Sequence, residues 1–177
     1  MTGFLRVMGV VNAAIWFGAA IFFTAVIGPA VFSQETHKLF GETAFPYYAG
    51  GIAMIMIRRY FLLQIICAAV ALLHFLLEKI SFQRKLTRFT LILLLSLFGL
   101  GLIGRFGFYP KMEALRQTMY FGQTAEQKEK ARSTFGAWHG FSQVVNLVMI
   151  GGLFIYLIQL NKPVESVRYG GVTKFRG

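Results

Sequence analysis

Four long apolar runs constrain the fold of this chain more than any other feature. They cover residues 7–32, 60–77, 89–108 and 138–160, and Arg105 is the only Lys, Arg, Asp or Glu within them. Each run approaches or exceeds the ~20 residues that an α-helix needs to cross a ~30 Å hydrocarbon core. The runs lack the period-2 alternation of barrel strands, and a bilayer admits only helices and closed barrels. The sequence therefore predicts an all-α integral membrane protein, a four-transmembrane-helix bundle.

Composition and charge agree with a membrane protein. The chain is 56% hydrophobic, with mean hydropathy +0.60, whereas a soluble domain has about 45–50% apolar residues. The net charge of +11 is spread along loops beside the apolar runs, which favours anionic lipid headgroups as a partner and not nucleic acid. We expect one membrane domain over residues 1–160 and a basic, flexible cytoplasmic tail over 161–177.

The distribution of positive charge predicts the orientation. Four crossings place both termini and the 78–88 loop on one side of the membrane. Four Lys or Arg fall within residues 78–88, whereas five are spread over residues 109–135. Because the positive-inside rule weights short loops near span ends, we expect both termini to be cytoplasmic. The expected location is the plasma membrane, which is the inner membrane if the source is bacterial.

Two segments on the other side are too long to be simple turns. The first, residues 33–59, contains Pro46 and Gly50-Gly51, and the second, residues 109–135, contains plausible helices over 111–120 and 124–133. Proline suits the first turn of a helix, and an i,i+4 Glu-Lys pair supports one. We expect amphipathic helical pieces that lie at the outer membrane surface and lead into the spans.

The fourth run begins with a polar face. His139, Ser142, Gln143 and Asn146 fall within about 100° of one another on a helix with 3.6 residues per turn. A polar face on a membrane helix is directed at protein or water, because lipid offers it no partner.

Residues of other spans lie at a similar depth. Gln64 is in the outer half of the second run, and Arg105 is in the outer half of the third. Arg105 is flanked by glycines 101, 104 and 107, which permit close approach of another helix. The candidate ligand site consists of Arg105, His139, Ser142, Asn146 and Gln64. The alternative is that Arg105 and His139 extend to the interface while Ser142 and Asn146 make ordinary interhelical hydrogen bonds.

The sequence offers little support for catalysis or proton transport. It contains no GxSxG, HExxH, P-loop or dinucleotide-binding pattern, so we predict no catalytic residue and no enzyme. It has no Asp, and none of its seven Glu falls within a predicted span. This argues against a proton-coupled or cation-selective transporter, because such pathways use intramembrane carboxylates. If the outer site binds a ligand, Arg105 favours an anionic group.

The histidines are poorly placed for a shared iron. His74 lies near the inner end of its run and His139 near the outer end of another, so they cannot hold one haem between them. His37 is on the same side as His139, and these two are weak metal candidates. We therefore expect no cofactor, with haem b or copper as the alternative.

Three stretches resemble the transmembrane protein 205-like family, a family whose domain (domain of unknown function 4149) has no assigned role. They are AIWFGAAIFFTAVIGPAVF, YYAGGIAMIMIRRYFLLQIICAAVALLHFL and WHGFSQVVNLVMIGGL. The resemblance implies a four-span helical membrane protein and brings no catalytic residue.

Three functions remain open from the sequence. The first is a non-enzymatic accessory or interaction subunit, or a small-ligand-binding bundle, whose partner is another membrane protein or a second copy of the chain. The second is a haem- or copper-binding bundle in redox or metal handling. The third is a transporter or channel for a small anion.

Overall fold

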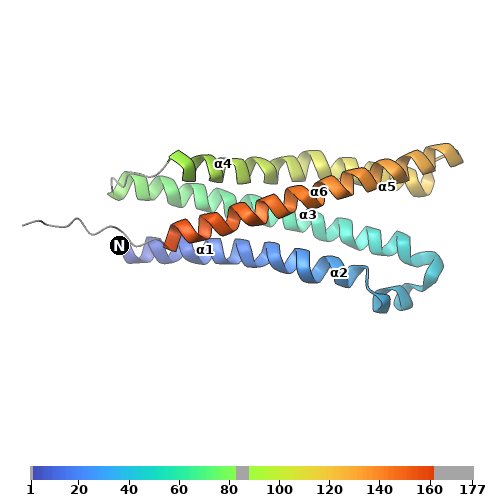
Figure 1. Cartoon of the computed structure of the whole chain (residues 1–177), viewed down its shortest axis with the longest axis horizontal. Helices are drawn as coiled ribbons and strands as arrows, with labels where there is room; N and C mark the ends of the chain where they lie inside the picture. The colour runs from blue at the N-terminus through green and yellow to red at the C-terminus, as the bar shows by residue number, and fades with distance from the viewer. Residues whose placement is uncertain (1, 83–87, 162–177) are drawn as a thin grey trace, which may run out of the picture.

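The computed structural model describes residues 2–82 and 88–161, which form four long helical segments running alternately up and down (Figure 1). The first consists of α1 (Thr2–Phe22), the π-helical turn η1 (Phe23–Ile27) and α2 (Gly28–Val31), and the second is α3 (Gln34–Phe82). The third consists of α4 (Arg88–Ile103), the π-helical turn η2 (Gly104–Phe108) and α5 (Tyr109–Phe121), and the fourth is α6 (Ala125–Asn161). The predicted tail beyond residue 161 lies outside the described residues.

The bundle has two ends, a terminal end and a loop end. The terminal end holds the start of α1 and the end of α6, and the loop end holds the connections at residues 32–33 and 122–124 (Figure 1). Both described chain ends therefore lie at the same end of the bundle, as an even number of crossings requires.

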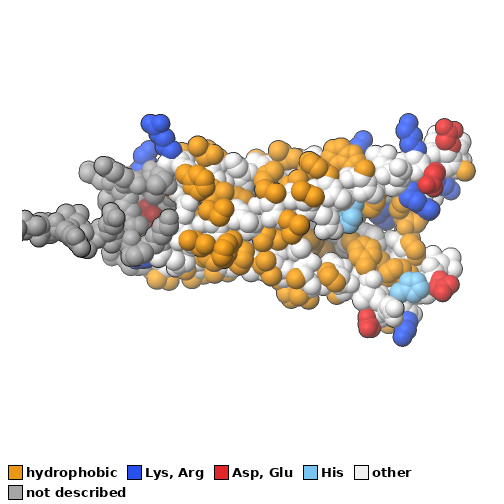
Figure 2. All heavy atoms as spheres, in the orientation of Figure 1, with side chains coloured by type: hydrophobic (Ala, Val, Ile, Leu, Met, Phe, Trp, Pro, Cys, Tyr) orange, Lys and Arg blue, Asp and Glu red, His pale blue; other side chains and the backbone are white. Residues whose placement is uncertain are grey.

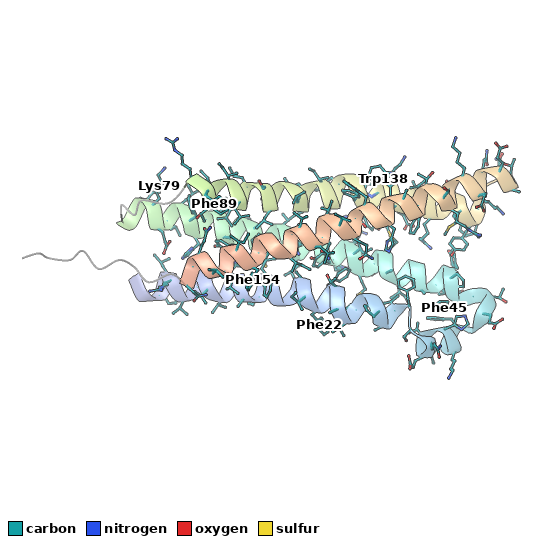
Figure 3. The ribbon with its side chains drawn as sticks, viewed as in Figure 1. Phe22, Phe45, Lys79, Phe89, Trp138 and Phe154 are labelled. Atoms are coloured by element: carbon teal, nitrogen blue, oxygen red, sulfur yellow. The ribbon has the colours of Figure 1, made fainter. Side chains whose placement is uncertain are left out.

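All four segments are long and apolar enough to span a membrane: Phe4–Val31, Gln34–Ile80, Arg88–Phe121 and Ala125–Asn161. Large apolar side chains cover the outside of the middle of the bundle, and charged ones gather toward its ends (Figure 2). Phe22, Phe89 and Phe154 belong to this exposed set and come from three different segments (Figure 3). Exposed apolar surface of this extent is unusual on a soluble monomer and suits contact with lipid.

The two long external segments are helical, as the sequence predicts, but most of their residues prolong the long helices. Residues 34–40 are the exception and form a short helix set off by a kink. α3 continues from residue 42 through its apolar run, α5 prolongs the third segment, and α6 includes residues 125–137. The chain changes direction within α3 at Gly41, whose φ of 71° and ψ of 160° are non-helical. Continuation has a physical advantage, because every additional helix end would leave up to four backbone groups without helical partners.

Each π-helical turn ends two residues before a proline. Pro29 follows η1 in α2, and Pro110 follows η2 in α5. A proline inside an α-helix lacks the N–H for its own hydrogen bond and clashes with the carbonyl four residues earlier. A wider turn before the proline lets the helix resume with proline in its first turn. The first and third segments are therefore widened at matching positions, toward the loop end.

The tightly packed core lies in the terminal half of the bundle. Its fully buried large side chains include Trp16 from α1, Leu94 from α4, and Leu153 and Tyr156 from α6. Small residues allow this approach: a Cβ at Gly9 would overlap the His74 imidazole. Gly101 and Gly104 are also buried, and a Cβ at Gly104 would overlap the Phe61 ring. The predicted glycine face of the third segment therefore packs on α3 at two of its three positions.

Candidate functional site

A cavity of about 750 Å³ lies between the loop halves of all four segments. Its wall includes the η1–α2 and η2–α5 regions, so both π-helical turns border it. Most lining side chains are apolar or aromatic, among them Phe23, Phe61, Phe108 and Phe135. The volume falls within the roughly 300–1,000 Å³ range of small-molecule sites. The bundle is thus tightly packed toward the terminal end and hollow toward the loop end.

A hydrogen-bonded network from three segments crosses the wall of this cavity. The Tyr60 hydroxyl donates to Asn146 Oδ1 at 2.9 Å, and Asn146 Nδ2 donates to the Thr24 hydroxyl at 2.7 Å. Thr24 in turn donates to the carbonyl of Ala20 at 2.8 Å. The Tyr60 ring stacks on Phe23 with centroids 4.3 Å apart. Asn146 therefore joins α6 to α3 and η1, which is the interhelical role that the sequence offered as its alternative.

Gln64 lies one helical turn closer to the terminal end than Tyr60 and does not line the cavity. Its side chain is 1% exposed, and its Oε1 accepts a hydrogen bond from the Trp16 indole. Its Nε2 is buried and has no hydrogen-bond partner among the described residues. Gln64 thus belongs to the contact between α1 and α3, on the side of the cavity that faces the terminal end.

The remaining polar residues at the start of the fourth run line the cavity but bond within their own helix. The Ser142 hydroxyl donates to the His139 carbonyl at 2.7 Å, and the Gln143 amide lies 3.1 Å from His139 Nε2. His139 is exposed and stacks on Phe135. Of the five predicted site residues, the structure brings His139, Ser142 and Asn146 to the cavity.

Arg105 lies outside this cavity, although it belongs to η2. Its guanidinium is 5.9 Å from the Phe106 ring centroid and 5.6 Å from that of Tyr109. A different arginine, Arg116 of α5, lines the cavity instead. The third segment thus contributes a cation, but from the region that the sequence analysis treated as a surface segment.

Arg116 is held on two sides. Its Nε and Nη2 donate to the two carboxylate oxygens of Glu113 at 3.2 and 3.0 Å. The guanidinium also lies 5.3 Å from the Tyr47 ring centroid. Gly50 and Gly51 of α3 lie against the same side chain, since a Cβ at either would be 3.7 Å from it. A second pocket of about 350 Å³ shares Met54, Tyr109 and Arg116 with the cavity, so Arg116 borders both.

The three histidines belong to different surroundings. His74 packs against α1, where its Nε2 donates to the Leu5 carbonyl at 2.8 Å, whereas His139 lines the cavity in the other half of the bundle. His37 packs against the Phe45 ring near the loop end (Figure 3). Over residues 2–82 and 88–161 there is no group of three His, Cys, Asp or Glu placed to hold a metal ion.

Glu78 corrects one inference from the sequence. It was expected beyond the end of a span at residue 77, yet α3 continues to Phe82 and Glu78 is only 8% exposed. Its Oε1 lies 3.9 Å from His74 Nε2, and the candidate span of this helix reaches Ile80. Glu78 therefore lies buried on the helix and not in the loop that the sequence predicts over residues 78–88.

Three residues at the cavity were not predicted from the sequence as members of one site: Arg116, Thr24 and Tyr60. Gly28-Pro29 and Tyr109-Pro110 carried a usable signal, because a proline within a long helical pattern marks a local distortion. Both distortions border the cavity.

Residues 11–120 match the family described as Domain of unknown function (DUF4149), and the chain belongs to that family. The match includes all the cavity-lining residues of the first three segments and ends before α6. No curated protein and no solved structure matches the chain.

Proposed function

We propose that the chain is a non-enzymatic integral membrane protein that binds a small, largely apolar ligand in the cavity between its loop halves. The observation that supports this most is the cavity itself, with its volume of about 750 Å³ and its mainly aromatic and aliphatic wall. The outside of the bundle is apolar as well, so a molecule dissolved in the bilayer can approach the cavity without passing through water.

A matched pair of substitutions on α3 tests this function. Ala53 lines the cavity, whereas Ala69 of the same helix is exposed on the outside of the bundle. In uncharged lipid nanodiscs, we expect the Ala53→Phe variant to bind tritiated hexadecanol at least about tenfold more weakly than the Ala69→Phe variant, because a phenyl ring displaces several buried CH₂ groups at ~0.8 kcal/mol each. Equal binding by both variants and the native chain contradicts the proposal.

The other functions have less in their favour. The haem alternative needs a pair of histidines at one site, and His74 and His139 lie in opposite halves of the bundle. The anion channel was based on Arg105, which lies outside the cavity. A docking role toward another membrane protein or a second copy remains compatible with the exposed apolar surface. The narrower resemblance to the transmembrane protein 205-like family stays a prediction.

We also propose a plasma-membrane location with both termini cytoplasmic and anionic headgroups on that side. The support is the concentration of Lys and Arg in residues 78–88. In a Cys67→Ala background, an impermeant thiol reagent added outside intact cells should label the Gln123→Cys variant and leave the Gln83→Cys variant unlabelled. The reverse pattern inverts the orientation.

A further inference from the structure

Arg116 is the one Lys, Arg, Asp or Glu among the described residues that line the large cavity. The wall of the cavity follows the third segment from Leu100 to Tyr120. Sixteen residues separate Leu100 from Arg116, a rise of about 24 Å at ~1.5 Å per residue. The cation thus lies toward the loop end. The wall beyond it toward the packed core is mainly apolar, and its polar side chains carry no formal charge: Thr24, Tyr60, His139, Ser142, Gln143 and Asn146.

The guanidinium retains hydrogen-bonding capacity after its pairing with Glu113. An arginine side chain carries about five N–H donors, and Glu113 takes one from Nε and one from Nη2. Two donors on Nη1 and one on Nη2 are not taken by this carboxylate. Nη1 lies against Gly51, which lines the second pocket, and the guanidinium also lies over the Tyr47 ring. Arginine in this state can still bind an oxyanion with charge-assisted hydrogen bonds.

The arrangement of charge and apolar wall matches the form of a lipid. An amphiphile in a bilayer keeps its head at the interface and extends its chain over about half of the ~30 Å hydrocarbon core, or ~15 Å. The cavity reproduces this order, with Arg116 toward the loop end and Phe61, Leu100 and Met149 deeper. The aromatic cluster of Tyr47, Tyr120 and Phe121 lies beside the arginine, with ring centroids 5.1–5.8 Å apart, as is common at membrane interfaces.

We propose that the ligand of the cavity is a single-chain amphiphile with an oxyanion head, a carboxylate or a phosphate monoester, and that Arg116 binds this head. The inference rests on the proposed function of the cavity and adds the chemical class of the ligand. Glu113 positions the guanidinium and also limits its affinity for an anion, because the carboxylate neutralises part of its charge.

The test measures equilibrium binding of palmitate, hexadecyl phosphate and hexadecanol to the full chain in nanodiscs of uncharged lipid. The native protein should bind at least one of the two anionic probes at least about tenfold more tightly than hexadecanol, since hydrogen bonds to charged groups exceed neutral ones. The tighter of the two identifies the head as carboxylate or phosphate.

Three variants separate recognition of the head from other effects. Arg116→Gln should abolish the preference for anionic probes, weakening their binding at least about tenfold more than that of hexadecanol. Lys111→Gln, which removes an exposed cation from the same helix, should keep the preference. Glu113→Gln should increase it, because the anion no longer competes with the carboxylate.

Two results overturn the inference: an anionic preference that survives Arg116→Gln, and a preference that Lys111→Gln removes to the same extent. Hexadecanol binding that remains sensitive to Ala53→Phe would then still support the cavity as a ligand site. Loss of that sensitivity would instead refute the proposed function.

Discussion

Asn146 joins three segments of the bundle, and its removal should weaken the wall of the cavity. Its side chain makes interhelical hydrogen bonds of 2.9 Å with Tyr60 and 2.7 Å with Thr24. Such bonds in membrane proteins average ~0.6 kcal/mol each and reach ~1.7 kcal/mol. Asn146→Ala should therefore lower the free energy of unfolding by about 1–3 kcal/mol.

A double-mutant cycle with Tyr60→Phe isolates one of these bonds. Tyr60→Phe removes the hydroxyl but keeps the ring that stacks on Phe23. The coupling between the two substitutions should be about 0.6–1.7 kcal/mol, measured by reversible unfolding in mixed micelles. Gln143→Ala provides the control: Gln143 is exposed and bonds within its own helix, so its effect should stay below ~0.5 kcal/mol. Additivity of Tyr60→Phe and Asn146→Ala within ~0.3 kcal/mol would refute the network.

Three further experiments test the packing and the site assignment. Gly9→Ala should lower the free energy of unfolding by about 1–3 kcal/mol, because the new Cβ would overlap the buried His74 imidazole. Gly18→Ala is the control and should be neutral or slightly stabilising, because the space around Gly18 is open. Equal effects of the two substitutions in thermal unfolding would contradict this packing. Trp16→Phe should cost about 1–3 kcal/mol because it leaves the buried Gln64 oxygen without its donor. Adding Gln64→Met should recover part of that loss, and a double variant less stable than Trp16→Phe alone would count against the explanation. Arg105→Gln should change hexadecanol and palmitate binding less than twofold, since Arg105 does not line the cavity. A tenfold loss would restore Arg105 to the site.

The four long apolar helices could be predicted from sequence because the signal is thermodynamic and local. A run such as residues 138–160 has no other stable environment than lipid or protein. The continuation of α3 to Phe82 could not be predicted in the same way, because hydropathy falls at Glu78 while the backbone remains helical. That difference is why a buried glutamate was assigned to a loop.

The composition of the site was harder to predict, because it depends on which faces meet. The helical periodicity correctly grouped His139, Ser142 and Asn146 on one face, and these three line the cavity. Periodicity within one run says nothing about which residue of another run lies opposite. Tyr60 and Thr24 were therefore not identified as the partners of Asn146, and Arg105 was preferred over Arg116, which lay in a segment taken for surface helix.

The central claim is that the cavity holds a membrane-soluble ligand, and native mass spectrometry of the protein purified from membranes tests it most directly. The chain should retain a bound molecule after detergent removal, with a mass and fragmentation typical of a single-chain amphiphile. The Ala69→Phe variant should retain the same adduct, and the Ala53→Phe variant should lose most of it. A native chain that carries no adduct, or an adduct that both variants retain equally, would contradict the account.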